Sequence, residues 1–524
     1  MIALRITALR ITAPRIPALL LGLLGPVLFG AVTLGAAELP HLPSEIPLGG
    51  ALLVARHADV DGDARLDMVF AVRADDGRRR IVIHLLRPDG RFAAEPDRSI
   101  EIKSDTIAWS LADLDPAPGM EVLLLTKSSV FGYRTAETKT RKAVWRIARA
   151  DFLCDLPDPR ELPYLECVHS LGVDEVSLIL PTPNGYAVWG RSGATDAFES
   201  RGTVPARAPT TTAPGIARGS VTIGIGSGPP PPEAGGQTAF VKGAGAEGVA
   251  GGSFLATEAW LPAITAADFN GDGRLDLWWV DERVEPATLR VHLQDAKGAF
   301  ATEASWSGPA PAGESLQVVD LDGDGAADVV AEDADGVQSQ RLRLFRNRGG
   351  AFDFETTDQL FKFEAFGIQP AFIDVDGDSR VELAVTSYGL PSKLDVLSAS
   401  IERKLLLYGR DPKGKDLFAR RTASTASDRM GAAQAQAFDH PLRLGGDFDG
   451  DGRHEWVAVD DEGALVVRPI GDRLELDRST RYRFVPRLRI RSFWMTDLNG
   501  DGCSDLILEH RGKVQLLVSR PKGV

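Results

Sequence analysis

Short runs of apolar residues recur along the chain, and each is only three to seven residues long before polar or glycine-rich positions interrupt it. Runs of this length between polar turns are typical of β-strands, whereas a helix needs apolar positions spaced three and four apart over a longer stretch. Only residues 423–437 show a pattern that a helix could use. The hydrophobic pattern therefore predicts an all-β chain.

The apolar runs come in consecutive pairs, and a turn with glycine and an aromatic residue follows, as in Asp89-Gly90-Arg91-Phe92. Strand, loop, strand, turn, strand, turn, strand in succession predicts a four-stranded antiparallel meander. The first runs of the pairs are residues 66–72, 275–280, 329–331, 383–386, 456–459 and 506–508. The second runs are residues 81–86, 289–293, 342–345, 404–408, 465–468 and 514–518.

A nine-residue polar loop precedes the first run of each pair. Its best copy is Asp320-Leu321-Asp322-Gly323-Asp324-Gly325-Ala326-Ala327-Asp328, with carboxylates at positions one, three, five and nine. The same register recurs at residues 59–67, 268–276, 374–382, 447–455 and 497–505, always with glycine at position four. Six copies in one register form an internal repeat, and such a repeat indicates architecture before it indicates a single site.

Two further units keep the strands, but their loops depart from the acidic pattern. Residues 109–115 begin like a loop unit, but Pro116-Ala117-Pro118 replaces the glycines, and residues 174–180 are followed by the turn Asn184-Gly185. Eight units then start at residues 59, 113, 174, 268, 320, 374, 447 and 497. Repeated four-stranded meanders predict a β-propeller of eight blades, or of seven if one worn unit is an insertion.

The last unit ends near Val518 without an outer strand, and residues 38–47 could supply it from the other end of the chain. Pairing of the two ends would close the ring and protect a sheet edge. Residues 203–252 are rich in glycine and proline, which predicts a flexible insertion from one blade. The expected organisation is one propeller domain at 38–524 behind an N-terminal segment at 1–37.

The spacing of acids in the loops favours a hard cation, because calcium takes six to eight oxygen ligands and packed carboxylates repel one another without a counter-ion. An EF-hand is excluded, since it needs a glutamate at position twelve. The residues found there are apolar: Phe70, Trp279, Ala331, Val385, Ala458 and Leu508.

The motif Asp-x-Asp-Gly-Asp-Gly-x-x-Asp, six times repeated, resembles the FG-GAP or VCBS repeat family, whose calcium-binding blades build the integrin α-chain head and many exported bacterial proteins. The resemblance covers residues 50–520 and implies up to six calcium ions, each held by side chains at positions one, three, five and nine and by the carbonyl at position seven. The implied ligands are Asp59, Asp61, Asp63, Arg65, Asp67, Asp268, Asn270, Asp272, Arg274, Asp276, Asp320, Asp322, Asp324, Ala326, Asp328, Asp374, Asp376, Asp378, Arg380, Glu382, Asp447, Asp449, Asp451, Arg453, Glu455, Asp497, Asn499, Asp501, Cys503 and Asp505.

The chain departs from the family pattern in three respects. The integrin ring has seven blades, and the Phe-Gly and Gly-Ala-Pro signatures of its repeats are not clear here. Ala64 and Ser379 replace glycine at position six, where a left-handed backbone would cost a non-glycine residue roughly 1–2 kcal/mol. These two loops are therefore expected to bind calcium more weakly.

The N-terminus predicts export. Arg5, Arg10 and Arg15 precede an apolar stretch at 18–34, and Gly35-Ala36-Ala37 offers a signal peptidase site. The alternative is an uncleaved membrane anchor, since residues 16–37 are about long enough to span a bilayer. A periplasmic or extracellular location follows from the first alternative, and membrane attachment from the second.

The formal net charge is −14, and 22 of the 73 acidic residues lie in the six loops. This balance argues against a nucleic-acid partner, which would require a basic face. Cys154 and Cys167 are close enough in sequence to form a disulfide in an oxidising compartment.

No local catalytic motif stands out. The eight histidines are scattered, and neither a zinc motif nor a Gly-x-Ser-x-Gly elbow occurs. The function predicted from the sequence is a calcium-stabilised binding or interaction scaffold for a protein or glycan ligand. Two alternatives stay open: a lyase-like enzyme that acts on polysaccharide, and a permanent subunit of a surface complex.

Overall fold

The computed structural model of this protein describes most of the chain between Ala37 and Arg520. Internal contacts divide the chain into Met1–Ala36 and Ala37–Val524, and every described residue belongs to the second unit. The described residues are 37–38, 40–114, 117–134, 144–152, 160–165, 168–170, 176–191, 198–206, 211–213, 223–224, 239–241, 256–258, 261–281, 284–311, 315–334, 336, 339–389, 400–431, 442–460 and 462–520. Residues 1–36, Cys154 and Cys167, and most of the insertion 203–252 lie outside them.

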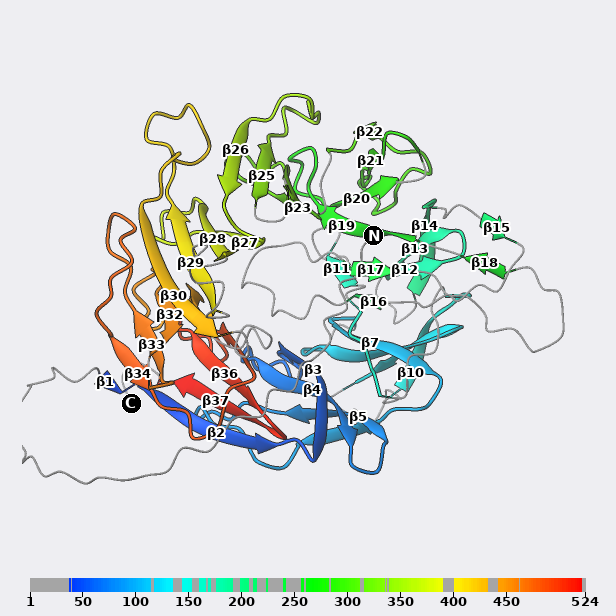
Figure 1. The fold of residues 1–524 in the computed structure, drawn as a ribbon. Helices are drawn as coiled ribbons and strands as arrows, with labels where there is room; N and C mark the ends of the chain where they lie inside the picture. The colour runs from blue at the N-terminus through cyan, green and yellow to red at the C-terminus, as the bar shows by residue number, and fades with distance from the viewer. Residues whose placement is uncertain are drawn as a thin grey trace, which may run out of the picture. The chain divides into compact units, whose positions relative to one another are not determined.

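Eight sheets, each containing four antiparallel strands, follow one another around a ring, and the described residues contain no helix (Figure 1). The all-β, eight-bladed prediction is confirmed, and the seven-bladed alternative is wrong. Blade 1 contains β3 (Gly50–Ala58), β4 (Asp67–Ala74), β5 (Arg79–His84) and β6 (Arg98–Glu101). Blade 2 contains β7 (Thr106–Ala112), β8 (Glu121–Thr126), β9 (Ser129–Tyr133) and β10 (Val144–Arg149), and blade 3 contains β11 (Val168–Ser170), β12 (Val176–Thr182), β13 (Gly185–Arg191) and β14 (Phe198–Val204).

The second half of the ring repeats this arrangement. Blade 4 contains β19 (Leu261–Ala267), β20 (Asp276–Asp281), β21 (Thr288–His292) and β22 (Trp306–Pro309), and blade 5 contains β23 (Ser315–Val319), β24 (Asp328–Ala334), β25 (Gln340–Phe345) and β26 (Gln359–Phe363). Blade 6 contains β27 (Gly367–Ile373), β28 (Glu382–Gly389), β29 (Ser400–Tyr408) and β30 (Ser424–Gly431). Blade 7 contains β31 (Leu442–Leu444), β32 (Trp456–Val459), β33 (Leu465–Arg468) and β34 (Tyr482–Phe484), and blade 8 contains β35 (Ser492–Thr496), β36 (Asp505–His510) and β37 (Lys513–Ser519).

The outer strand of blade 8 comes from the N-terminal end of the unit. Strand β2 (His41–Pro47) pairs antiparallel with β37, with His41 opposite Ser519 and Pro47 opposite Lys513. The predicted closure is thus confirmed, although the strand begins at His41 rather than at Glu38. Glu38 belongs instead to β1 (Ala37–Glu38), which pairs parallel with β34 of blade 7.

The described parts of the insertion form short strands. Strand β17 (Ala239–Val241) pairs with the first strand of blade 4, and β16 (Ile223–Gly224) pairs with β17. Strands β15 (Thr211–Ala213) and β18 (Ala256–Glu258) form a separate pair. No helix of the described residues is long and apolar enough to cross a membrane.

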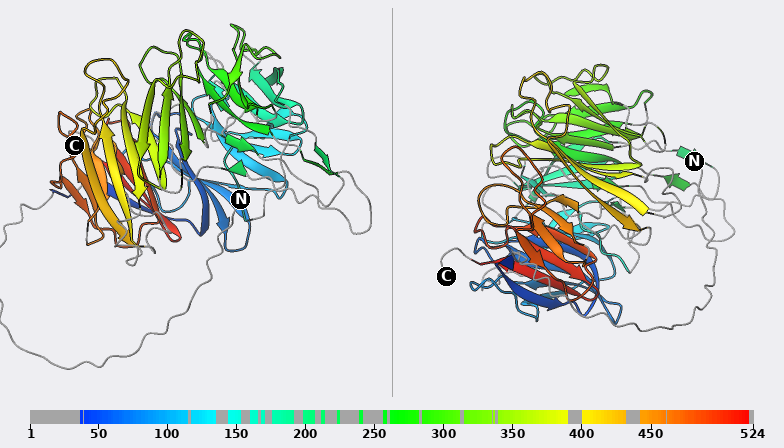
Figure 2. Two further views of the ribbon diagram at one scale, coloured as in Figure 1. Left: turned by 45° about the horizontal axis from the view of Figure 1, so that its top comes forward. Right: turned by 60° about the vertical axis from the view of Figure 1, so that its left-hand side comes forward.

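Each blade is buried on both faces, because neighbouring residues of a strand point to opposite sides of the sheet. In β24, Val329 and Ala331 pack against blade 4, while Val330 packs against blade 6. The same division holds around the ring, and eight apolar clusters fill the eight interfaces between successive blades. Figure 2 shows the sheets standing side by side in this way. The final cluster joins blade 8 to blade 1 and so closes the ring.

Several tryptophans pack in or against these apolar clusters. Trp109 and Trp278 are 1% exposed, and Trp456 is 2% exposed. Trp189 and Trp306 pack against the edges of apolar clusters. These positions favour a role in packing for the tryptophans rather than one in stacking against a sugar.

The closing strand provides the first test of the architecture. Ile46 in β2 is fully buried in the cluster between blades 8 and 1. We expect Ile46→Ala to lower the free energy of unfolding by about 2–5 kcal/mol, the usual cost of truncating a buried aliphatic side chain. Urea unfolding followed by tryptophan fluorescence measures this change. Leu360→Ala, at a residue that is 46% exposed, is the matched control and should change stability little. An equal effect of the two substitutions would contradict closure by β2.

Candidate metal sites

All six acidic loops connect the first and second strands of their blades, as the repeat predicts. The loops lie in blades 1, 4, 5, 6, 7 and 8, and the two worn units form blades 2 and 3. Each loop is thus held at both ends by strands that are buried between neighbouring blades.

The carboxylate at position one organises the loop. In the loop of blade 5, Asp320 Oδ1 accepts the amide of Gly323 at 2.7 Å, and Oδ2 accepts the amide of Gly325 at 3.0 Å. The other five loops repeat both bonds. Position one therefore satisfies the turn's own backbone donors, whatever else it binds.

This turn requires a left-handed backbone at positions four and six. Gly323 and Gly325 have φ of 80° and 89°. Ala64 and Ser379, which replace glycine at position six, have φ of 67° and 68°. Both residues therefore adopt the left-handed backbone that the sequence predicts, which is unfavourable for a residue other than glycine.

The carboxylate at position nine is buried at the base of the loop. Asp328 Oδ2 accepts the amide of Leu321 at 2.9 Å, and Oδ1 accepts the amide of Asn347 at 2.7 Å. The first of these bonds recurs in all six loops. It recurs also in blade 2, where Glu121 accepts the amide of Leu114 although the loop has lost the glycines at positions four and six and the acid at position five. Position nine therefore ties the loop to the sheet independently of a metal.

Burial sets the protonation of these acids. It disfavours the charged form, while the backbone amide bonds favour it. The net effect raises the pKa to about 7 for Asp67, Asp328, Glu382, Glu455 and Asp505, and to about 6 for Asp276. A cation nearby would favour the charged form of each.

Carboxylate oxygens converge in four of the loops. Groups within 4.8 Å of one another are Asp59, Asp61 and Asp67; Asp320, Asp322 and Asp328; Asp374, Asp376 and Glu382; and Asp447, Asp449 and Asp451. The first three groups combine positions one, three and nine. Burial, and next the carboxylate at position five, raise the pKa of Asp61, Asp322 and Asp376. These acidic clusters could hold a metal ion.

The blade 5 cluster has an additional feature. Asp322 Oδ1 is buried and has no hydrogen-bond partner among the described residues. Arg346 comes to 3.9 Å from the other oxygen of Asp322. A buried carboxylate oxygen without a donor is costly, and a cation would satisfy it. The residues of this loop therefore fit a bound divalent ion.

The loops of blades 4 and 8 differ, because asparagine stands at position three. Asn270 donates to Asp272 at 2.9 Å, and Asn499 donates to the carbonyl of Ser519 at 3.1 Å. Three carboxylates do not gather within 4.8 Å in the described residues of either loop. These two loops contain three carboxylates each, one fewer than each of the other four loops.

The carboxylate at position five already accepts a hydrogen bond from within its own loop. Its carboxylate accepts the amide of position seven in every loop, from Arg65, Arg274, Ala326, Arg380, Arg453 and Cys503. The side chains of Arg65 and Arg274 also form ion pairs with Asp63 and Asp272. The carbonyl of position seven stays a predicted ligand.

Backbone hydrogen bonds connect successive loops, a feature that the sequence did not reveal. The amide at position eight of one loop donates to the carbonyl at position one or two of the preceding loop: Leu66 to Leu498 at 2.7 Å, Ala327 to Asp268 at 2.7 Å and His454 to Val375 at 3.0 Å. Met120 of blade 2 makes the same bond to Asp59 at 2.8 Å. Arg410 reaches Leu321 with its guanidinium at 2.7 Å. A shift of the backbone in one loop therefore alters the hydrogen bonds of the loop in the adjacent blade.

The left-handed positions provide a test of loop strain. We expect Ala64→Gly and Ser379→Gly each to raise the free energy of unfolding by about 0.5–1 kcal/mol. The relief of left-handed strain is partly offset by the greater backbone freedom of glycine in the unfolded chain. Urea unfolding of the metal-free variants measures the gain. Gly273→Ala is the reverse control. The backbone φ of Gly273 is 80°, and a Cβ added there would have no atom within 4 Å, so the substitution introduces left-handed strain without a clash. A loss of stability in both glycine variants would show that the two loops are not strained.

One family model matches the region of two of these loops. A model of the FG-GAP-like repeat matches residues 268–331, which contain the loops of blades 4 and 5. The chain is also similar to the crystal structure of the exotype rhamnogalacturonan lyase YesX, with 14% identity and a TM-score of 0.31 over 91% of this chain and 76% of that chain. No curated protein matches the chain. The FG-GAP-like repeat at residues 268–331, the six loops in one register and the eight blades fit a β-propeller of the FG-GAP/VCBS type.

Proposed function

We propose that this protein is an exported propeller that binds calcium through its acidic loops and presents the stiffened ring as a binding scaffold. The observation that supports calcium best is the blade 5 cluster, where three carboxylates converge and Asp322 Oδ1 lacks a hydrogen-bond partner among the described residues. The ligand set consists of oxygens alone, which calcium prefers. Blades 1 and 6 offer the corresponding residues at positions one, three and nine.

The proposed role of calcium is structural. The ion would cancel the repulsion among the loop carboxylates, and a ligand that binds only the folded ring stabilises it by mass action. Backbone bonds between successive loops would carry this effect from one blade to the next. The residues that hold the ions are then support for a binding surface elsewhere on the ring.

Export and the nature of the ligand belong to the same proposal. Export is supported by the arginines and the apolar stretch ahead of Ala37. A scaffold role is supported by the loops themselves, whose acids bind backbone amides and so serve the architecture. The ligand that we propose is a protein or a glycan.

Calcium removal tests the first part of the proposal. We expect chelation with EGTA to lower the melting temperature of the whole protein, because free calcium at about 100 times its Kd adds about 2.7 kcal/mol per site. Asp322→Asn should reduce this calcium-dependent gain, since it weakens one site. Asp89→Asn, at an exposed turn of blade 1, is the control and should leave the gain unchanged. If EGTA leaves the melting temperature unchanged, and the protein holds no bound metal, the calcium proposal is wrong.

A panel of glycans and polyuronates tests the scaffold. Retention of a ligand that is recovered unchanged supports a binding module. Release of unsaturated sugar ends would instead show a lyase and overturn the scaffold. Co-purification of one protein in stoichiometric amount, and no binding of glycans, would identify a permanent subunit.

A further inference from the structure

In blade 7 the positively charged side chain of Arg481 contacts the acidic loop at residues 447–455. The guanidinium of Arg481 forms an ion pair with Asp449, at position three, and its Nη1 lies 2.9 Å from Glu455 Oε1, at position nine. Glu455 is 2% exposed and Asp449 is 16% exposed, so both carboxylates are largely shielded from water. One nitrogen of Arg481 thus bridges positions three and nine, whose carboxylate oxygens lie close to each other and to position one in blades 1, 5 and 6.

The carboxylate groups differ accordingly. In blades 1, 5 and 6 the converging set consists of positions one, three and nine. In blade 7 it consists of positions one, three and five, and Glu455 is not a member. The second oxygen of Glu455 meets Arg481, whereas the second oxygen of Asp328 accepts a backbone amide.

The position of Arg481 in its blade is shared by other residues elsewhere in the ring. The residue there donates its amide to the third strand: Asp97 to Ile83, Ser305 to Val291, Asp358 to Leu344, Ala423 to Leu407 and Arg481 to Val467. Only Arg481 among these five carries a positive charge. The contact with the acidic loop is therefore a property of this side chain and not of the backbone.

A proline explains why arginine is tolerated at this position. In blades 1, 4 and 5 the side chain at the position of Arg481 accepts a hydrogen bond from a backbone amide just after the third strand. The pairs are Asp97 with Leu85 at 2.8 Å, Ser305 with Leu293 at 3.2 Å and Asp358 with Arg346 at 2.8 Å. In blade 7 the residue that corresponds to the amide donors Leu85, Leu293 and Arg346 is Pro469, which has no amide hydrogen to donate. An acceptor is not needed there, and position 481 is free to carry a cation.

We propose that Arg481 takes the place of the divalent ion in blade 7, so that this loop is held without metal while the other clusters are open to calcium. The residues of the loop do not fit the ion that the repeat pattern predicts, because the guanidinium already neutralises positions three and nine. Three carboxylates remain near one another at positions one, three and five, but one of them is paired with Arg481. This inference rests on the proposed calcium binding for the remaining loops.

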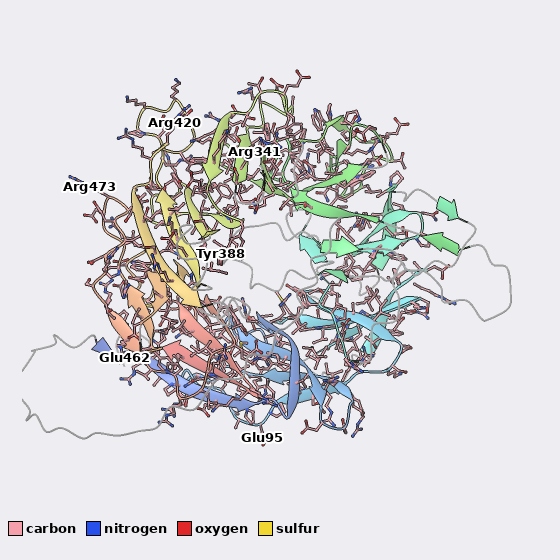
Figure 3. The ribbon with its side chains drawn as sticks, viewed as in Figure 1. Glu95, Arg341, Tyr388, Arg420, Glu462 and Arg473 are labelled. Atoms are coloured by element: carbon pink, nitrogen blue, oxygen red, sulfur yellow. The ribbon has the colours of Figure 1, made fainter. Side chains whose placement is uncertain are left out.

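The count of bound calcium tests the inference. Arg481→Ala should bind one more calcium ion per chain than the wild type, measured by atomic emission after dialysis of the full chain against calcium. Arg483→Ala, two residues further along in β34, is the matched control, because Arg483 pairs with Asp460 and Glu462 outside the loop. Figure 3 shows Glu462 at the outer edge of blade 7. The control should bind the same number of ions as the wild type.

Metal-free stability provides a second readout. In EGTA, Arg481→Ala should have a lower melting temperature than both the wild type and Arg483→Ala, because Glu455 and Asp449 lose their counter-ion. Added calcium should restore more of the melting temperature in this variant than in the wild type. Asp449→Asn in the Arg481→Ala background should remove the additional ion.

The outcomes separate the inference from the proposed function. Equal calcium counts in Arg481→Ala and the wild type, where the wild type binds calcium, would overturn the inference alone. A wild type without calcium and a variant with one ion would overturn the proposed function and support the inference. Loss of one ion from the wild type in Glu455→Gln, with Arg481 intact, would show that the blade 7 loop holds metal and would overturn the inference.

Discussion

A buried carboxylate that accepts backbone amides is the constraint on which the loops of this propeller depend. Asp328 illustrates it, with one oxygen on the loop at Leu321 and the other on the end of the third strand at Asn347. Unpaired amides at this depth would be costly, so the acid is needed whether or not an ion is bound. Blade 2 supports this view, because Glu121 keeps the bond to Leu114 although Pro116-Ala117-Pro118 replaces the glycines and the acid at position five. The metal, where it binds, joins an arrangement that the backbone has already determined.

The ring imposes the second constraint, which is that no blade buries its own surface. Val329 and Val330 are neighbours in one strand, yet they pack against different blades. Eight such interfaces must form together, and the last of them needs β2 from the other end of the chain. The bonds between successive loops add a polar connection to the apolar one. Stiffening of a single loop therefore acts on an interface and not only on a hairpin.

The eight blades, the closing strand and the six loops could be predicted because their signals are local: short apolar runs, glycines that require a positive φ, and acids at fixed spacing. The strain at Ala64 and Ser379 follows from the same local pattern. The two roles of position nine could not be separated, because a carboxylate that binds an amide and one that binds an ion occupy the same place in the sequence. The contribution of Arg481 was hidden as well, since it lies 26 residues after Glu455 and reaches the loop only through the register of β33 and β34.

The six loops are alike in sequence but have different solutions to the same electrostatic problem. Packed carboxylates must be relieved of their mutual repulsion by an external cation, by loss of a charge or by a cation of the protein. Blades 1, 5 and 6 gather three acids and suit the first solution, and blades 4 and 8 place asparagine at position three and suit the second. Blade 7 adopts the third through Arg481. An internal cation does not depend on the medium, so blade 7, which lies beside the junction of the two chain ends, keeps its shape where calcium is scarce.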